Sequence, residues 1–492
     1  MAAVAPLLGG CDSDHPASPS KGSSQGPSQG SAEGAARGSS PRIAIVGAGL
    51  AGLTCAYELS RNRVPATVYE ANPDRFGGRC WTSRGWANGQ TAEHGGEFID
   101  TVHHSIRGLS TELGLVLDDL DDVPATRPPA RDRYFLLGEV RSGSEVYAGY
   151  GRLRARADAD ARRIGSVRYD AAGKAARALD EMTAEQWLDD VLGHDHPLLR
   201  AATVQYLAEE YGLDPSELSA ITMVTEYASG GLPSDERFHV RGGNDQLVTR
   251  LADRLPDGSV VRDAALARLT RLTDGSYRLG FTAGPDVSAD VVVLAAPFAS
   301  LRHADLDGAG LSDRKLACIR TLGMGTNAKL LLQLDHRLSH YGVTPRSRWS
   351  GEYYDARVDT WDSSALEPGG AGLLTVYSGG HVGASYPVAA PHGRAPAPVV
   401  DEALAEVDRA VPGLARGFAG RAWLDAWVDD PFTRGSYAAF GPGQVTRYWG
   451  FVGVAEGRVH FAGEHTSMRA QGFLDGAVSS GQRAAREVLA AL

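Results

Sequence analysis

The chain has 492 residues, of which 43% are hydrophobic and 22% charged, a composition typical of a soluble globular protein and long enough for two domains. A formal net charge of -11 without a dense Lys/Arg run argues against a nucleic-acid partner. The sequence contains no run of about eighteen apolar residues, so we predict no transmembrane span. The four cysteines show no C-x-x-C pairing, so we predict neither a metal site nor a disulfide framework.

The first forty residues differ from the rest in composition. They are rich in Ser, Gly and Pro from residue 12 on, so we expect residues 1–40 to form a disordered tether. Near the start, the stretch 8–11 (LGGC) resembles a bacterial lipobox, in which Cys11 would be lipidated. The segment lacks a basic start, so two interpretations stay open: an exported protein, envelope-anchored or secreted, and a cytoplasmic one.

A nucleotide-binding pattern follows the tether. Residues 43–46 form an apolar run of strand length, and residues 53–59 follow a helical pattern. Between them stand three glycines in the G-x-G-x-x-G spacing, Gly47, Gly49 and Gly52. The first permits a tight turn, the second lets the backbone approach a pyrophosphate, and the third lets helix and strand pack closely. Free N–H groups at the helix start would hold the phosphates.

A second strand pattern completes a βαβ unit. Residues 67–69 are followed by Glu70, about twenty residues beyond the glycines. Its carboxylate would accept the ribose hydroxyls and would repel a 2′-phosphate. A glycine-rich turn without a ligand is the alternative, but a strand, a helix and a terminal acid in this order favour a nucleotide.

Two further glycine turns follow. Gly77-Gly78-Arg79 places a guanidinium where it can pair with a pyrophosphate, a feature for which a nicotinamide fold has no obvious use. Gly95-Gly96 offers bare backbone that could lie against a flat ring. The three glycine clusters together predict a long ligand.

The alternation of helices and strands returns in the middle of the chain. Residues 183–193 and 196–212 follow helical patterns, and residues 241–255 give a glycine turn with an amphipathic helix. Val260 then begins a strand, and a buried strand ends at Ala296. A nucleotide domain built from separate stretches predicts a parallel-sheet core interrupted by insertions.

The C-terminal segment repeats the strand, turn and helix order. Residues 458–462 predict a buried strand, Gly463-Glu464 a turn, and residues 473–489 an amphipathic helix. A core helix without a ligand is the alternative for this last element.

The order of these motifs resembles the flavin-dependent amine oxidase family, which includes monoamine oxidases, polyamine oxidases and L-amino-acid oxidases. The matching segments are GAGLAGL, YEAN, GGR and EHGGEF near the start and GRVHFAGEHTSMRAQGFLDGAVSSGQRAA at the end. The resemblance covers residues 41–100, about 240–335 and 420–492. It implies that the nucleotide is FAD. Covalently flavinylated members have cysteine where Ser436 stands here, so we expect non-covalent FAD.

The resemblance implies an α/β fold. A Rossmann-like FAD-binding domain of the glutathione-reductase type would be interleaved with an α+β substrate-binding domain. We expect the FAD-binding domain in residues 41–100, 240–310 and 450–492, and the substrate-binding domain in residues 101–239 and 311–449.

The resemblance also implies a set of cofactor-binding residues. Val260 would lie against the adenine, Glu464 would bind the ribityl and phosphate stretch, and the final helix would direct its positive dipole end at the flavin. The full set is Gly47, Gly49, Gly52, Glu70, Gly78, Arg79, Gly95, Gly96, Val260, Gly463, Glu464 and Phe473.

Three residues would carry the chemistry. Lys329 interrupts an otherwise uncharged strand pattern, and the resemblance implies that it holds a water at flavin N5 and favours oxygen reduction; an exposed lysine on an edge strand is the alternative. Tyr437 and Phe473 match the two walls of the family's aromatic cage around the amine, with plain core aromatics as the alternative.

The implied reaction is FAD-dependent oxidative deamination. A free amine would lose a hydride to flavin N5, the imine would hydrolyse to a carbonyl, and O2 would be reduced to H2O2. The expected partners are a small amine or amino acid and O2, and a homodimer stays open. Alternatives on the same scaffold are an L-amino-acid oxidase for basic amino acids, a desaturase or isomerase of polyenes, and a non-catalytic flavoprotein used for binding.

Glu97 bears on the choice between amine and amino acid. It stands after Gly95-Gly96, the glycine pair of the third motif, where L-amino-acid oxidases commonly have an arginine that binds the substrate carboxylate. A Glu97 that faces the pocket would favour primary amines, diamines or polyamines. Alternatively, it pairs with a neighbouring arginine and never meets substrate. A basic amino acid would need another partner for its carboxylate, such as Arg84, Arg241 or Arg447.

Overall fold

The computed structural model describes residues 2–3, 41–122, 133–229, 232–341, 353–355 and 359–492. The lipobox-like stretch and nearly all of the predicted tether lie outside these residues. Ala2–Ala3 forms a two-residue strand, β1, that pairs antiparallel with β9 (Leu232–Pro233).

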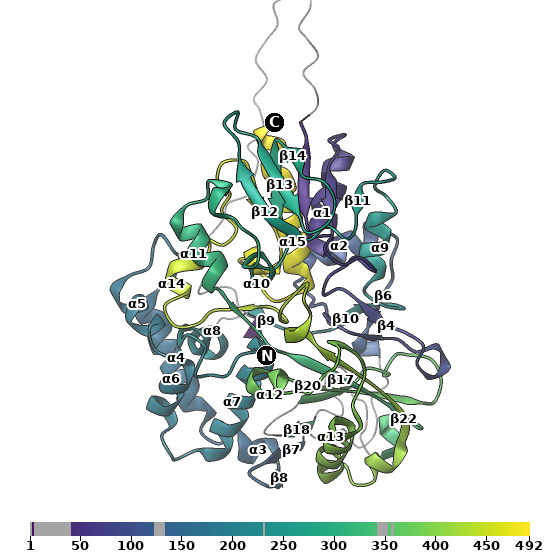
Figure 1. Cartoon of the computed structure of the whole chain (residues 1–492). Coiled ribbons are helices and arrows are strands. Elements are labelled where there is room, and N and C mark those ends of the chain that lie inside the picture. Colours follow the sequence, from purple (N-terminus) through teal and green to yellow (C-terminus); the bar gives the residue numbers. More distant parts are fainter. Residues whose placement is uncertain (1, 4–40, 123–132, 230–231, 342–352, 356–358) are drawn as a thin grey trace, which may run out of the picture.

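A five-stranded parallel sheet forms one part of the molecule (Figure 1). Its strands, in spatial order, are β11 (Val260–Val261), β3 (Thr67–Tyr69), β2 (Ile43–Val46), β15 (Val291–Leu294) and β24 (Val459–Phe461). β2 and β15 are buried at every position, as expected for central parallel strands covered on both faces. Three distant stretches of chain therefore build one sheet.

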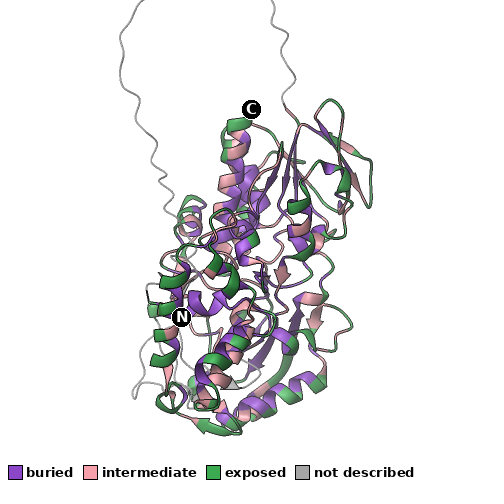
Figure 2. Ribbon diagram, turned by 90° about the vertical axis from the view of Figure 1, so that its left-hand side faces the viewer, coloured by how far each residue is buried: buried purple, intermediate pink, exposed green. Residues whose placement is uncertain are grey.

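The helices of this part pack against the sheet and against one another. They are α1 (Leu50–Arg61), α2 (His104–Glu112), α9 (Gln246–Ala252) and α15 (Leu474–Ala491). Their apolar residues share one buried core with β2 and β15. Figure 2 shows this core as buried strands and inward helix faces, with the exposed positions on the outside. α1 and α15 approach so closely that a Cβ added to Gly481 would overlap the carbonyl oxygen of Ala51.

Several elements are inserted between these strands. A three-stranded antiparallel sheet separates β11 from β15, and a group of helices precedes β9. The sheet is formed by β12 (Leu266–Arg271), β13 (Tyr277–Phe281) and β14 (Val287–Ala289). The helices are α3 (Gly143–Val146), α4 (Tyr150–Ile164), α5 (Lys174–Asp180), α6 (Ala184–Leu192), α7 (Pro197–Tyr211) and α8 (Ile221–Tyr227). α6 and α7 confirm the two helices predicted in this region.

A five-stranded antiparallel sheet forms the other part. Its strands, in spatial order, are β19 (Asp359–Asp362), β20 (Gly372–Ser378), β17 (Ala328–Leu334), β22 (Phe418–Ala426) and β21 (His392–Arg394). The central strand β17 is buried throughout, and α13 (Ala397–Ala410) packs its apolar side on the sheet.

One row of side chains crosses this second sheet from edge to edge. The strand registers place Asp359 opposite Tyr377, Tyr377 opposite Lys329, Lys329 opposite Asp425, and Asp425 opposite His392. Residues directly opposite one another in antiparallel strands point to the same face. The five side chains, here called the cross-sheet row, therefore share one face. Lys329 stands on the central strand, which rules out the edge-strand alternative for it.

The remaining elements are short. The strands are β4 (Thr82–Ser83), β5 (Ala92–Glu93), β6 (Leu117–Asp119), β7 (Arg133–Leu136), β8 (Glu139–Arg141), β10 (Phe238–Val240), β16 (Gly323–Met324), β18 (Tyr353–Asp355) and β23 (Ala438–Ala439). The helices are α10 (Phe298–Leu301), α11 (Asp313–Thr321), α12 (Gly380–Ala384) and α14 (Val445–Tyr448). The whole is a mixed α/β fold, as predicted. Over the described ranges, no helix is long and apolar enough to cross a membrane, and no cluster of His, Cys, Asp and Glu is arranged to hold a metal ion.

The α1–α15 contact predicts a large effect from one methyl group. We expect Gly481→Ala to lower the free energy of unfolding by about 1–3 kcal/mol, because the added methyl must push the two helices apart. Gly151→Ala in α4 is the matched control, since open space surrounds that position; it should raise stability slightly, by up to about 1 kcal/mol. Thermal unfolding of the three proteins measures both changes. Equal melting temperatures for the Gly481 variant and the unmodified protein would contradict this packing.

Candidate active site

A cavity of about 630 Å³ is lined by residues from both large sheets. The glycine turns of the parallel-sheet part line one end. Aromatic and acidic side chains of α7 and the antiparallel sheet line the other. Every sequence-predicted site residue except Gly52 and Val260 lines this cavity.

The first glycine turn is shaped for close approach. Gly47 has a φ of +104°, a conformation that favours glycine, and lies directly before the start of α1. A Cβ at Gly52 would overlap the Gly47 carbonyl oxygen, so this residue serves helix packing and does not line the cavity. The N-terminus of α1 opens beside the cavity with Leu50 and Ala51 in its wall, where free N–H groups attract anions.

Glu70 ends β3 and lines the same end of the cavity. One of its carboxylate oxygens accepts the N–H of Ala48 at 2.8 Å, and the other accepts the N–H of Asn72 at 2.9 Å. Burial raises the pKa of Glu70, although these two N–H groups oppose the shift. The acid is therefore held by backbone at the predicted place for a ribose, and a ribose contact stays a prediction.

Val260 is not where the sequence analysis expected it. Its strand β11 is the edge of the parallel sheet, paired with Val68, and its side chain does not line the cavity. Ala264, Ala265 and Leu266, just beyond, form the wall there instead. The chain bends at Asp263 after β11, so these residues reach the cavity and Val260 does not; a contact of Val260 with the adenine stays a prediction that the cavity lining does not support.

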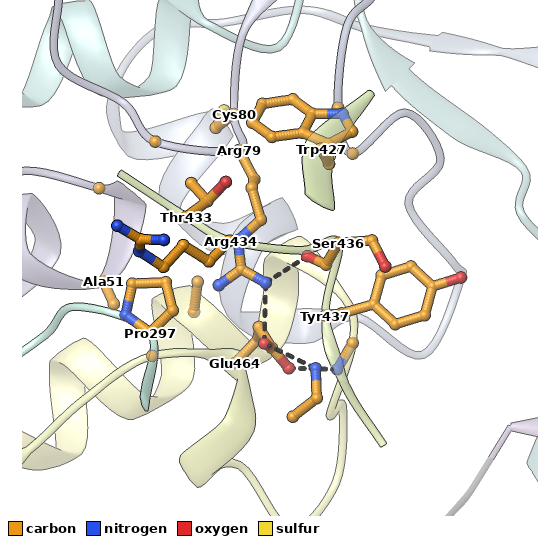
Figure 3. A pocket seen from close by; sticks show the side chains of 18 of the residues that line it. Ala51, Arg79, Cys80, Pro297, Trp427, Thr433, Arg434, Ser436, Tyr437 and Glu464 are labelled. Carbon is orange, nitrogen blue, oxygen red and sulfur yellow. Dashed lines mark hydrogen bonds and ion pairs between the residues drawn. The ribbon is translucent and has the colours of Figure 1, made fainter. Parts of the chain in front are cut away.

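Arg79, which is partly buried, and Glu464, which is buried, form an ion pair at 2.9 Å (Figure 3). Arg79 also donates to the Ser436 carbonyl oxygen. Glu464 accepts the N–H of Ala438 at 3.2 Å and that of Gly472, just before α15, at 2.9 Å. Glu464 thus connects the second glycine turn, β23 and the start of α15 through its contacts with Arg79, Ala438 and Gly472.

Two arginines that the sequence analysis did not single out join Arg79 in this region. Arg75 donates to the Gly78 carbonyl oxygen at 2.7 Å and lines the cavity. Arg434 lies beside Thr433, Pro297 and Ala51 in Figure 3, with a φ of +54°. Its guanidinium makes no hydrogen bond or ion pair within the described part of the chain.

These residues fit a pyrophosphate-containing cofactor such as FAD. An unpaired guanidinium lies near a helix N-terminus, and the buried Thr433 hydroxyl beside it has no hydrogen-bond partner among the described residues. Buried polar groups without partners are uncommon, and here they face a long cavity with a glycine-lined end.

Residues 93–97, here called the 93–97 turn, line the cavity with four of their positions, His94 to Glu97. Lys329 donates to the carbonyl oxygen of Gly95 at 2.9 Å and to that of Glu93 at 3.3 Å. Gly96 packs so tightly on Leu474 that a Cβ there would lie 2.8 Å from that side chain. The turn is therefore held between the antiparallel sheet and α15.

Lys329 forms a buried ion pair with Glu97 at 2.7 Å, with side-chain exposures of 6% and 10%. Together with the bonds to Glu93 and Gly95, this contact uses all three ammonium N–H donors. A water held by Lys329 at flavin N5, which the resemblance implies, stays a prediction, and it would have to share a donor with these partners.

Glu97 lines the cavity, one of the two possibilities that the sequence left open, but its charge is paired. Its second oxygen accepts the Trp361 indole N–H at 3.1 Å and the Ser363 hydroxyl at 3.1 Å. The alternative of an arginine partner is wrong, because the partner is Lys329. An unpaired acid that attracts a substrate cation must therefore be sought elsewhere in the cavity.

The aromatic wall is larger than expected. Tyr437 and Phe473 both line the cavity; the Tyr437 hydroxyl donates to the Glu209 carbonyl oxygen at 2.7 Å, and Phe473 packs 4.8 Å from the His103 ring. Tyr377 lies 3.0 Å from Tyr437 between the two hydroxyl oxygens. Trp361 packs on Tyr377 with ring centroids 5.4 Å apart, and these two residues were missed.

Besides Glu209, whose carboxylate accepts from the Gln205 side chain, three acidic residues line the end of the cavity away from the glycine turns: Glu210, Glu236 and Asp359. No hydrogen bond or ion pair from a described residue reaches the carboxyl groups of Glu210 and Glu236. Burial and the nearby Glu226 and Glu236 raise the pKa of Glu210 well above its usual range. Burial and neighbouring acids raise the pKa of Glu236 to about 8, and burial raises that of Asp359 to about 8.

The three arginines considered for a substrate carboxylate lie outside the cavity. Arg84 pairs with Asp245 at 2.5 Å, Arg241 with Asp118 at 2.6 Å, and Arg447 lies 3.7 Å from Glu181. The cavity-lining arginines, by contrast, surround the glycine-lined end.

The residue before Tyr437 is Ser436, whose hydroxyl donates to the Asn327 side chain at 2.5 Å. Cys80 does line the cavity, which the sequence analysis did not anticipate. Its thiol donates to the Asn244 carbonyl oxygen at 3.2 Å, and burial raises its pKa well above the usual range, so it is a poor nucleophile.

Comparison with known proteins places these features among flavoenzymes. The family described as flavin containing amine oxidoreductase matches residues 50–489. An L-amino-acid oxidase of Siganus canaliculatus is 26% identical over 92% of this chain and 85% of its own length. Cyclohexylamine oxidase from Brevibacterium oxydans IH-35A has a TM-score of 0.78, and putrescine oxidase bound to putrescine 0.77. Each of these two structures is 22% identical, with 92% of this chain and 99% of the other covered.

A bound flavin should be released by acid. Ser436 is a weak nucleophile held by Asn327, and Cys80 is a protonated thiol, so neither is expected to form a covalent link. Acid precipitation should leave the yellow flavin in the supernatant, as judged by its absorption spectrum. Flavin that stays with the precipitated chain and survives proteolysis as a flavinylated peptide would contradict this expectation.

Proposed function

Because the chain belongs to the flavin-containing amine oxidoreductases, it is an FAD-dependent enzyme that oxidises amines, and we propose that its substrate carries a second positive charge. The reaction is oxidative deamination of that amine to an imine, which hydrolyses to a carbonyl. O2 is the proposed electron acceptor, with H2O2 as the product.

The observation that carries this proposal is the uneven charge of the cavity. Arginines surround the glycine-lined end, whereas Glu210, Glu236 and Asp359 line the far end without a cationic side chain bonded to them among the described residues. Burial raises the pKa of all three carboxyl groups, and a bound ammonium or guanidinium would oppose this shift by favouring their ionised form. The cavity therefore favours a diamine, a polyamine or a guanidino amine.

The same distribution argues against an amino acid. A substrate carboxylate near the aromatic wall would meet Lys329, whose charge is already paired with Glu97. It would then face the acidic end. The similarity to an L-amino-acid oxidase supports the amino-acid alternative. The two solved oxidases are named for amine substrates, cyclohexylamine and putrescine, and support an amine.

The chain's own residues have separable roles in this proposal. Arg75, Arg79 and Arg434 would hold the pyrophosphate of FAD, and the 93–97 turn would lie against its ring system. When bound, FAD would supply the acceptor for the hydride that leaves the carbon beside the amine nitrogen, and O2 would take the electrons from it. Tyr437 and Phe473 would flank the amine and exclude water, which favours its uncharged form.

We also propose the domain organisation expected from the sequence. A Rossmann-like FAD-binding domain of the glutathione-reductase type would comprise residues 41–100, 240–310 and 450–492, and the parallel sheet, whose strands come from these stretches, supports this. Residues 101–239 and 311–449 would form the substrate-binding domain. Export with lipidation at Cys11 remains a proposal that rests on the lipobox-like stretch alone.

Because Lys329 and Glu97 carry paired charges, replacing one or the other should change the rate of the reaction with oxygen differently. Lys329→Met leaves Glu97 unbalanced and should slow reoxidation of the reduced enzyme about tenfold or more, because negative charge builds up as oxygen is reduced. Glu97→Gln leaves the ammonium unbalanced and should not slow it. Stopped-flow mixing with oxygen measures both rates. Equal slowing in both variants would show that the pair acts only by holding the fold.

The acidic end predicts the order of three matched substrates. The value of kcat/KM for 1,5-diaminopentane should exceed that for pentylamine by about tenfold to a hundredfold, because the second nitrogen gains a hydrogen bond to a charged group. Lysine should have the lowest kcat/KM of the three substrates. Glu236→Gln should reduce the diamine value about tenfold and leave pentylamine nearly unchanged. Peroxide formation measures all three.

Glu185→Gln, on the exposed surface of α6, is the control for this experiment and should change none of these values. A preference for lysine that Glu236→Gln does not alter would place the enzyme among amino-acid oxidases. Substrate-dependent bleaching of the flavin without peroxide would retain the amine as substrate but assign the electrons to an acceptor other than O2.

A further inference from the structure

A network of buried charges lies behind the 93–97 turn, beyond the residues that line the substrate end. Its centre is Asp425, which is fully buried in the cross-sheet row next to Lys329. The Asp425 carboxylate accepts from His94 Nδ1 at 2.8 Å, from His392 Nδ1 at 2.8 Å and from Trp423 Nε1 at 3.0 Å. None of these contacts has a part in the function proposed above.

His392 lies between two carboxylates. Its Nδ1 lies 2.8 Å from Asp425 and its Nε2 lies 3.2 Å from Asp430, whose side chain is also buried. An ionised carboxylate only accepts hydrogen bonds, so both ring nitrogens must carry a proton. His392 is therefore an imidazolium in this arrangement. Burial alone would lower its pKa, but its bonds to Asp425 and Asp430 outweigh burial and raise it.

This network is connected directly to the turn. His94 belongs to the turn, and its ring is oriented by Asp425 while its carbonyl oxygen accepts the Trp427 indole N–H at 3.0 Å. The next carbonyl oxygen, that of Gly95, accepts from Lys329. Asp425 and Lys329 are neighbours in the cross-sheet row, so one edge-to-edge set of side chains holds two successive residues of the turn.

Two aromatic rings pack against His392, and a second cation, Arg75, contacts its partner Asp430. Arg75 lies 3.9 Å from Asp430 and stacks over Trp81 at 4.1 Å. Trp81 meets His392 edge-on at 5.1 Å and stacks on His94 at 3.8 Å, and Trp427 meets His392 edge-on at 4.7 Å. Arg75 balances only part of the charge on Asp430, so His392 supplies the remaining positive charge between the two acids.

We propose that the His392 imidazolium is a positioning residue that, through Asp425 and His94, holds the 93–97 turn in the shape that receives the flavin, and that its deprotonation loosens this turn. Loss of the proton would direct a nitrogen lone pair at a buried carboxylate and leave Asp425 and Asp430 underbalanced. The inference needs a bound flavin but does not depend on which amine is the substrate.

The sign of the pH dependence follows from the direction of the shift. Since the folded-state pKa of His392 is raised, its contribution is fully present below the ordinary histidine pKa of about 6.5 and is lost as pH rises through the folded-state value. Asp425 and Asp430, whose pKa values these partners hold low, stay ionised throughout this range. FAD should therefore be retained best at mildly acidic to neutral pH and released faster at alkaline pH.

The experiment compares three FAD-loaded proteins: the unmodified protein, His392→Gln and His381→Gln. The rate of FAD release is followed by the fluorescence of free FAD between about pH 6 and pH 9. His392→Gln keeps one donor but no charge; we expect release about tenfold faster at neutral pH and a flatter pH profile. His381→Gln is the matched control, because His381 also pairs with an acid, Asp214 at 3.0 Å, but is 79% exposed. It should release FAD like the unmodified protein.

A His392 variant that retains FAD as tightly as the unmodified protein, with the same pH profile, would overturn the proposal. If that variant fails to fold by circular dichroism, NMR titration of His392 in the unmodified holoenzyme decides. A pKa well above 6.5, with flavin release that follows the same titration, supports the proposal, and an imidazole that is neutral at pH 7 overturns it. Neither readout requires turnover, so a wrong substrate assignment cannot imitate either result.

Discussion

The buried ion pair between Lys329 and Glu97 is the contact on which the geometry of the site depends. Lys329 belongs to the central strand of the antiparallel sheet, whereas Glu97 ends the turn proposed to face the flavin. Removing one partner of such a pair costs about 3–5 kcal/mol, because the other charge stays buried and unpaired. The pair therefore sets the distance between the cofactor end of the cavity and the wall that receives the amine.

The ion pair of Arg79 and Glu464 likewise holds separate stretches of the chain together, at the glycine-lined end of the cavity. This pair joins the second glycine turn to the start of α15, and Glu464 also fixes the strand segment that carries Tyr437. Each of the two ion pairs connects stretches far apart in the sequence. Stretches of chain that are far apart in the sequence thus form one cavity, because these two ion pairs hold them together.

The local motifs could be predicted from the sequence, and the long-range pairings could not. Gly47 and Glu70 stand in one βαβ unit, where spacing alone determines their places. The cross-sheet row, by contrast, depends on the register of five strands, and a shift of one residue would turn every side chain to the other face. This is why Tyr377 and Asp359 were missed and why the partner of Glu97 was not identified.

The separation of charge in the cavity follows from what it must hold. A dinucleotide brings negative phosphates and an amine substrate brings positive charge, so arginines and carboxylates mixed along one cavity would pair with each other and bind neither ligand. Here the cavity-lining arginines stand at the glycine-lined end with Glu70 and Glu464, two acids that are held by backbone N–H groups and by Arg79. Glu210, Glu236 and Asp359 line the other end, and the charges of Lys329 and Glu97 are paired with each other. Such an arrangement would orient the proposed diamine with one ammonium toward the acids, which leaves the other nitrogen, as the uncharged amine, near the aromatic wall. The end that reacts would thus be selected by the charge of the end that does not.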